Sequence, residues 1–174
     1  EQAEEHALFS GDHVLGWGTT LVFNMKEYMS TLHRMLALKP TRLYPGHGGY
    51  IEDGVDILTR YTEHRERREE QAWMALAAKT RPVPIMEIVQ ELYPNTSMER
   101  SWMAKDNVEK LFRKFAADGS AGAWTASVDA NGTETLVPHE VSQSYSERRL
   151  QDGLLWASRR AMAALPLPGR RAKL

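Results

Sequence analysis

The chain has 174 residues, no cysteine and a formal net charge of −1 at pH 7. Hydrophobic residues make up 42% and charged residues 26%, a globular balance that excludes disorder throughout. No apolar run reaches the ~18–20 residues that cross a bilayer, so we expect no membrane partner. Without cysteine the chain has neither disulfides nor thiolate zinc ligands, which suits an intracellular protein.

Residues 1–79 begin with a strand–helix–strand pattern. Residues 7–10 form a short apolar run that ends at Gly11, as a buried strand entering a loop does. A helix is expected from the N-cap Asn24 to Pro40, and a second strand over residues 41–44. This is a βαβ-like unit of the α/β class, and two strands cannot form a stable layered core without partner structure.

Residues 80–140 have a different layout. A long charged helix over residues 57–79 ends at a proline-rich boundary, residues 80–84. Two helices with apolar stripes follow, and Asn131-Gly132 then predicts a hairpin turn between two strands. The order helix, helix, hairpin is typical of a winged-helix module.

Residues 141–174 are expected to form an amphipathic helix followed by a basic tail. They carry seven arginine and lysine residues against two acidic ones, a charge of +5, which leaves −6 on residues 1–140. A basic tail on an acidic body can contact a polyanion or a partner, and it can equally be a solvated terminal helix.

Two residues stand where ligands gather in an α/β sheet. Asp12 and His47 each follow a short strand, in loops that contain glycine. A carboxylate and an imidazole both bind zinc well. The spacing alone leaves other roles open, because an Asp in a Gly-Asp turn commonly caps its own backbone and a single His is commonly structural.

Three motifs extend this reading: residues 11–20 (GDHVLGWGTT), 44–48 (YPGHG) and 61–71 (YTEHRERREEQ). Together they resemble the second half of a metallo-β-lactamase-fold hydrolase, most strongly the lactamase-like endoribonuclease branch that includes beta-lactamase-like protein two. That branch is related to glyoxalase II and to lactamase-type thioesterases. The resemblance covers roughly residues 5–137. It implies the C-terminal part of an αββα sandwich over residues 1–79 and a winged-helix-like α+β domain over residues 80–140.

The resemblance also implies roles for the two strand-end residues. Asp12 would bridge two zinc ions, as a catalytic and metal-binding residue, and His47 would bind one of them. The family's other ligands, a His-x-His-x-Asp-His block and a further His, precede the bridging Asp, and no His-x-His occurs in this chain. We therefore expect weak zinc binding and no catalysis by this chain alone, and a need for the missing N-terminal half or a partner chain.

Three functions follow from the resemblance and stay open. The first is zinc-dependent cleavage of single-stranded RNA, since two metals can stabilise an in-line displacement at phosphorus. The second is thioester hydrolysis, and the third is a non-catalytic role as a degenerate or split assembly subunit. The location implied is the cytoplasm or the mitochondrial matrix.

Other residues have weaker functional alternatives. His64 and Arg65 either belong to a solvated helix face or steady a loop or a phosphate near the site. Trp17 is either a lid or core aromatic or a platform for a nucleobase. The second helix of the 80–140 segment carries positive charge, but acidic neighbours dilute that charge. This mixture favours the binding of a single-stranded RNA backbone over recognition of duplex DNA. Those basic residues are Lys105, Lys110, Arg113 and Lys114.

Overall fold

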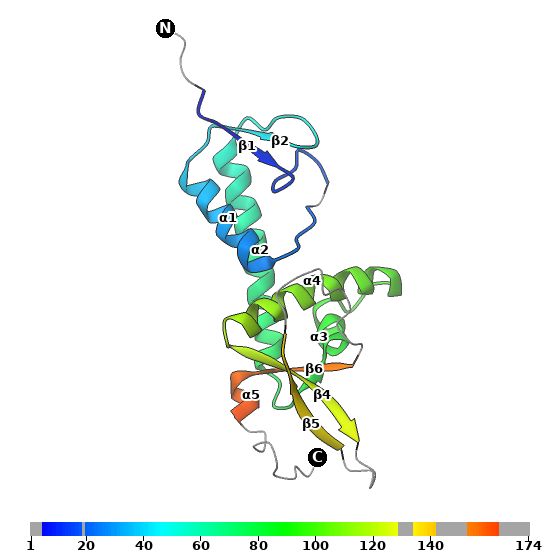
Figure 1. The fold of residues 1–174 in the computed structure, drawn as a ribbon. Helices are drawn as coiled ribbons and strands as arrows, with labels where there is room; N and C mark the ends of the chain where they lie inside the picture. The colour runs from blue at the N-terminus through cyan, green and yellow to red at the C-terminus, as the bar shows by residue number, and fades with distance from the viewer. Residues whose placement is uncertain (1–4, 19, 129–133, 142–152, 164–174) are drawn as a thin grey trace. The chain divides into compact units, whose positions relative to one another are not determined.

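The structure is a computed structural model, and it describes residues 5–18, 20–128, 134–141 and 153–163. The chain divides into two compact units, Glu1–Arg68 and Glu69–Leu174 (Figure 1). The division falls inside one long helix. The sequence pattern placed the boundary after that helix, at residues 80–84, where the proline-rich segment begins.

Unit 1 is built on the expected strand–helix–strand unit. Strand β1 (Ala7–Gly11) pairs in parallel with β2 (Arg42–Pro45), and helix α1 (Met25–Ala37) connects them. Helix α2 (Gly54–Ala77) follows and contributes its first turns to this unit. The predicted α/β character of this segment is therefore confirmed.

Local sequence signals explain where α1 begins and what it buries. Asn24 is extended, and its side-chain carbonyl accepts a hydrogen bond from the Glu27 amide at 3.2 Å, so one free amide of the first turn is satisfied. Apolar residues at helical spacing then point to the interior of the unit. These residues are buried, as are Leu43 of β2 and Leu58 of α2, and they are Met25, Tyr28, Met29, Leu32 and Met35.

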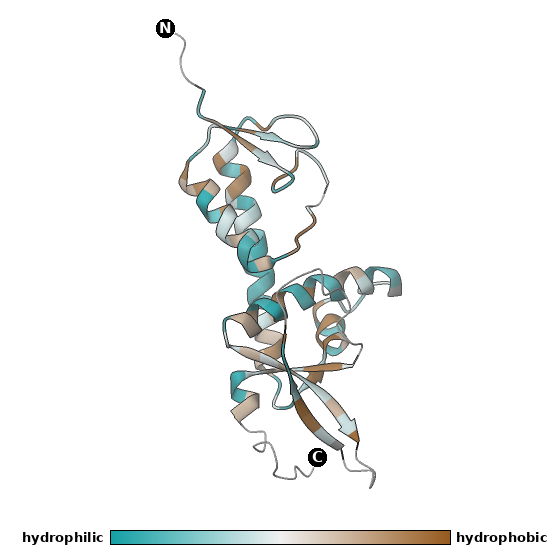
Figure 2. Cartoon of the chain, viewed as in Figure 1, coloured by the Kyte–Doolittle hydropathy of each residue, from teal (hydrophilic) through white to brown (hydrophobic). Residues whose placement is uncertain are grey.

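The two faces of the β1–β2 sheet differ sharply. Leu43 and Ser10 are buried, whereas Phe9 is 82% exposed and stacks on the Tyr44 ring at 5.2 Å. The Tyr44 ring in turn lies 6.2 Å from that of Tyr50. Figure 2 shows that the middle of α2 is hydrophilic. The open sheet face is thus lined by aromatic rings, unlike the usual polar outer face of a half-solvated sheet.

Unit 2 combines three helices, besides the end of α2, with a four-stranded sheet. The sheet has the order β3-β6-β4-β5 and is antiparallel throughout. Phe112 and Trp156 lie at the centre of the core, with ring centroids 5.3 Å apart. The elements are β3 (Val83–Pro84), α3 (Ile85–Leu92), α4 (Met98–Ala117), β4 (Ala121–Val128), β5 (Glu134–His139), β6 (Leu154–Ser158) and α5 (Arg159–Ala163).

The order helix, helix, hairpin is confirmed in α3, α4, β4 and β5, while the winged-helix assignment itself stays a prediction. The Asn131-Gly132 turn lies outside the described residues. One prediction is wrong: residues 154–158 form a strand, where an amphipathic helix was expected. β6 pairs with both β3 and β4, and those non-local hydrogen bonds outweigh the local helical spacing. Residues 159–163 of the same segment are helical, as α5, and residues 142–152 and 164–174 are outside the described part of the chain.

The helices of the described segments are too short or too polar to traverse a bilayer.

Candidate metal centre

Asp12 and His47 meet at one end of the β1–β2 sheet. Each residue follows the carboxyl end of its strand, and because the strands are parallel the two loops lie at the same edge. Asp12 Oδ1 is 3.4 Å from His47 Nε2, and the side chains are 72% and 67% exposed, respectively. The sequence-based expectation that these two side chains converge agrees with this geometry.

Glycines allow the two loops to approach this closely. The Gly46 amide donates to the Gly11 carbonyl at 2.8 Å, and a Cβ on Gly46 would lie 2.6 Å from Asp12 Oδ1. The Gly16 amide donates to the His47 carbonyl at 3.0 Å. Gly48 has a φ of +91°, a conformation that side chains rarely adopt. The loops are therefore joined through their backbones, and the space left at Gly46 is filled by the Asp12 carboxylate.

The pair offers one oxygen and one nitrogen donor to a cation. Within the residues that the structure describes, His, Asp and Glu side chains form no group of three or more that could hold a metal ion. A zinc ion prefers about four ligands. Asp12 and His47 could therefore supply part of a metal centre, and any further ligands must come from elsewhere.

The loop that carries Asp12 is fastened to α1 by His13 and Tyr28, for which the sequence suggested no site role. The Tyr28 hydroxyl donates to the His13 carbonyl at 3.0 Å, and the two rings stack at 4.4 Å. The Arg65 guanidinium lies over the Tyr28 ring, with its central carbon 5.3 Å from the ring centroid. The apolar spacing of α1 predicts that Tyr28 is buried. Because a buried tyrosine hydroxyl needs a hydrogen-bond partner, this was the signal that could have pointed to its contact with the Asp12 loop.

The other candidate residues of unit 1 lie in different settings. Trp17 is exposed, and a Cβ on Gly48 would lie 2.5 Å from its Cδ1, so the indole covers the loop that follows His47. His64 is exposed on α2. Partial desolvation of this exposed side chain and three neighbouring arginines lower the pKa of His64 below its ordinary value. Of the two residues singled out on α2, Arg65 thus contacts the Asp12 region through Tyr28, and no contact of His64 with it is found in the described residues.

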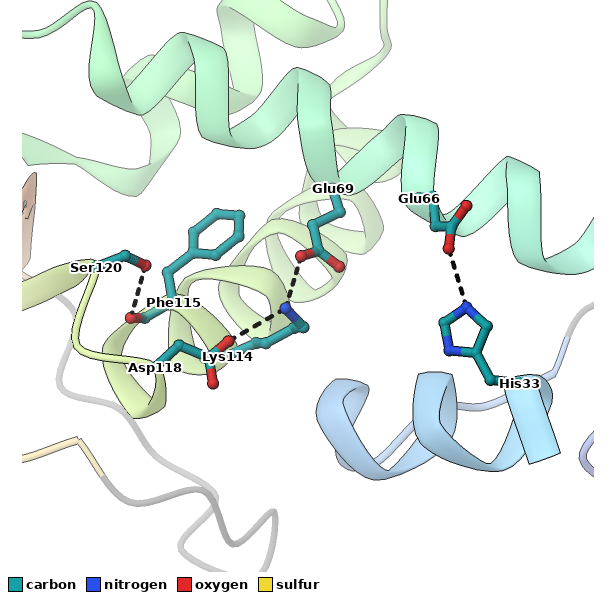
Figure 3. A network of polar contacts seen from close by, with 7 residues as sticks. All are labelled: His33, Glu66, Glu69, Lys114, Phe115, Asp118 and Ser120. Carbon is teal, nitrogen blue, oxygen red and sulfur yellow. Dashed lines mark hydrogen bonds and ion pairs between the residues drawn. The ribbon is translucent and has the colours of Figure 1, made fainter.

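Three of the four basic residues singled out on α4 are paired with carboxylates, and Lys105 Nζ lies 5.1 Å from the centroid of the Trp102 ring. Lys110 bonds Asp106 at 2.5 Å and Arg113 bonds Glu109 at 3.1 Å. Figure 3 shows Lys114, which bonds Glu69 at 2.6 Å and Asp118 at 3.2 Å, and separately the His33–Glu66 contact of unit 1. Partial burial opposes protonation of Lys114, but these two carboxylates raise its pKa above the ordinary value. This pairing agrees with the expectation that acidic neighbours dilute the positive charge of the helix.

No family model matches the chain. The chain is 35% identical over 116 residues to a beta-lactamase-like protein 2 homolog of Caenorhabditis elegans, across 67% of this chain and 39% of that protein. It is 42% identical over 73 residues to an atrochrysone carboxyl ACP thioesterase of Aspergillus fumigatus, across 42% of this chain and 23% of that protein.

A solved structure has the same fold. The metallo-beta-lactamase family protein from Thermus thermophilus matches with a TM-score of 0.52 and 18% identity, over 89% of this chain and 42% of that protein. The chain thus spans about two fifths of the length of the C. elegans relative and of this structural neighbour. These relatives and the shared fold show that the chain belongs to the metallo-β-lactamase-fold family and corresponds to the C-terminal part of that fold.

Proposed function

We propose that this chain supplies two ligands, Asp12 and His47, to the zinc centre of a hydrolase that cleaves single-stranded RNA in its complete form. The observation that carries the proposal is the 3.4 Å separation of Asp12 Oδ1 and His47 Nε2. A charge-assisted hydrogen bond is shorter, about 2.7–2.9 Å. Two ligands on one tetrahedral zinc, with bonds of about 2.0–2.2 Å, lie about 3.3–3.5 Å apart. The observed spacing therefore fits two donors to one cation.

The chemistry of the two donors supports the roles assigned to them. A carboxylate has two oxygens, so Asp12 can bridge two ions, while a neutral imidazole nitrogen binds one. Both side chains are open to solvent, as a site that receives a substrate must be. When bound, a dinuclear zinc centre supplies an activated water and stabilises developing negative charge. The part of this chain is to hold the ions at the end of the β1–β2 sheet and to leave the approach to them open.

We infer that the remaining ligands and the partner structure come from the part of the fold that these 174 residues do not cover. The aromatic face of Phe9, Tyr44 and Tyr50 supports this inference, because an exposed apolar sheet face needs a further layer. A partner chain or the N-terminal half of the same polypeptide can provide that layer. The location, in the cytoplasm or the mitochondrial matrix, remains part of the proposal.

The test uses a complete form of the protein that includes the His-x-His-x-Asp-His block. We expect zinc-loaded protein to cleave a labelled single-stranded RNA, chelator to stop the cleavage, and Asp12→Asn to abolish it. Asp56→Asn is the matched control, since Asp56 is also exposed and pairs with Arg60 on α2. RNA that stays intact under all conditions contradicts the RNA assignment.

Thioester hydrolysis is the second candidate. The similarity to an atrochrysone carboxyl ACP thioesterase favours it, and the same Asp12–His47 pair could serve attack at a carbonyl. An acyl thioester offered beside the RNA decides between them: turnover of the thioester alone selects this candidate. A complete form that binds no zinc and turns over neither substrate supports the third alternative, a non-catalytic assembly subunit.

A further inference from the structure

The residue after Asp12 is bonded reciprocally to helix α1. The Tyr28 hydroxyl donates to the His13 carbonyl at 3.0 Å, and His13 Nε2 lies 3.2 Å from the Tyr28 carbonyl. The rings of the two residues stack with their centroids 4.4 Å apart. Each side chain is therefore bonded to the other residue's backbone, which fixes both the position of the loop and the rotation of its backbone beside Asp12.

Other hydrogen bonds close the same turn around Asp12. The His13 amide donates to the Ser10 carbonyl at 3.0 Å, and the buried Ser10 hydroxyl donates to the Val14 carbonyl at 2.9 Å. The Thr20 hydroxyl also donates to the His13 carbonyl, at 3.3 Å. The His13 carbonyl thus accepts two side-chain hydroxyls from different segments. The Asp12 side chain, by contrast, is exposed, so the position of its Cα and Cβ depends on the backbone that carries it.

Arg65 supports Tyr28 from helix α2. Its guanidinium carbon lies 5.3 Å from the centroid of the Tyr28 ring, within range of a cation–π contact. Tyr28 is only 5% exposed, so its ring cannot move without disturbing this contact or the His13 stack. Burial raises the pKa of Tyr28 although Arg65 opposes the change, and the phenol therefore keeps its proton as a donor at neutral pH.

We propose that Tyr28, supported by Arg65, is a positioning residue that fixes the Asp12 carboxylate for metal binding. This inference rests on the proposed metal role of Asp12. The path runs from Arg65 to the Tyr28 ring and from the Tyr28 hydroxyl to the backbone next to Asp12. Residues that orient metal ligands typically contribute about 10-fold or more to metal affinity. Tyr28 acts through the backbone, so we expect removal of its hydroxyl to weaken zinc binding by about 10-fold, the lower end of that range.

The test titrates zinc into the 174-residue chain and follows the carboxyl ¹³C signal of Asp12 and the ring signals of His47 by NMR. Tyr28→Phe keeps the ring stack and the cation–π contact and removes only the hydroxyl. We expect it to need about 10-fold more zinc for half-saturation, measured well below its melting temperature. Tyr50→Phe is the matched control, because it removes an exposed hydroxyl 3.5 Å from Glu52 in the same unit, and it should titrate as wild type.

A second variant and a stability measurement separate positioning from folding. Arg65→Met removes the cation over the Tyr28 ring and should weaken zinc binding in the same direction. A purely structural role would lower the melting temperature of these variants and leave the zinc affinity of the folded chain unchanged. That result, with Asp12→Asn losing the zinc response, overturns the positioning role and leaves the proposed function intact. If Asp12→Asn binds zinc as wild type does, the proposed metal role itself is wrong.

Discussion

Gly46→Ala should weaken zinc binding at Asp12 and His47 without unfolding the chain. A Cβ at position 46 would lie 2.6 Å from Asp12 Oδ1, about 0.8 Å short of the 3.4 Å at which ordinary contact begins. The oxygen is the far end of a flexible side chain, so the carboxylate can rotate away, and the Gly11 carbonyl carbon, 3.2 Å from the same Cβ, must give by only a few tenths of an ångström. A rotation off the preferred rotamer costs about 0.5–1.5 kcal/mol. The stability of the unit should therefore fall only slightly.

Metal affinity is more sensitive to the same displacement. Metal–ligand distances tolerate deviations of about 0.2 Å, so the displaced carboxylate must move back against the new Cβ before it can bind zinc, and that cost lowers the affinity. We expect about a 10-fold loss of zinc affinity, which is about 1.4 kcal/mol. The assay is the zinc titration followed at Asp12 and His47 by NMR, with the melting temperature measured in parallel.

Gly49→Ala is the control for this substitution. It adds the same methyl group to the same loop, and a Cβ there meets no atom within 4 Å. We expect wild-type affinity and stability. The reasoning is refuted if Gly46→Ala binds zinc as tightly as wild type, because the carboxylate position beside Gly46 would then be irrelevant to binding. Equal losses in both variants would refute it as well, since a general effect on the loop would explain them.

Three further predictions concern stability. Phe112→Ala should cost about 3–5 kcal/mol in a denaturant titration, because Phe112 is fully buried, whereas Val128→Ala, at a 61% exposed position, should cost less than about 0.5 kcal/mol. Glu69→Gln should lower stability by about 0.5–1 kcal/mol through the partly buried Lys114 pair, an effect that salt should reduce. The pKa of His64 is lowered from 6.5 in the folded chain, so the unfolded chain binds a proton at this histidine first as the pH falls. Acidification through and below pH 6.5 should therefore destabilise the wild type more than the His64→Gln variant. Equal pH dependence of the two unfolding free energies would contradict this prediction.

Elements with strong local signals could be predicted from the sequence. The Asn24 cap and the apolar spacing after it determine α1, and the stripe of Ile85, Ile88 and Val89 determines α3. β6 could not be predicted in this way. Leu154 and Leu155 fit a helical pattern and a buried strand equally well, and the choice depends on pairing with Val83 and with β4, which are distant in the sequence.

The candidate site shows the same limit. Asp12 and His47 could be singled out because both follow strands whose ends must share an edge if the strands are parallel. Their metal role, however, came from the resemblance and remains a proposal. The contribution of Tyr28 depends on a hydrogen bond from α1 to the backbone of the Asp12 loop, and that contact is decided by the packing of the unit. A sequence pattern could indicate only that the buried hydroxyl needed an acceptor.

Crystals of the chain grown with zinc, measured by anomalous scattering at the zinc absorption edge, test the central claim most directly. We expect a zinc peak bonded to a carboxylate oxygen of Asp12 and to His47 Nε2 at about 2.0–2.2 Å. Zinc bound only at other side chains, with Asp12 and His47 both free of metal, would contradict it.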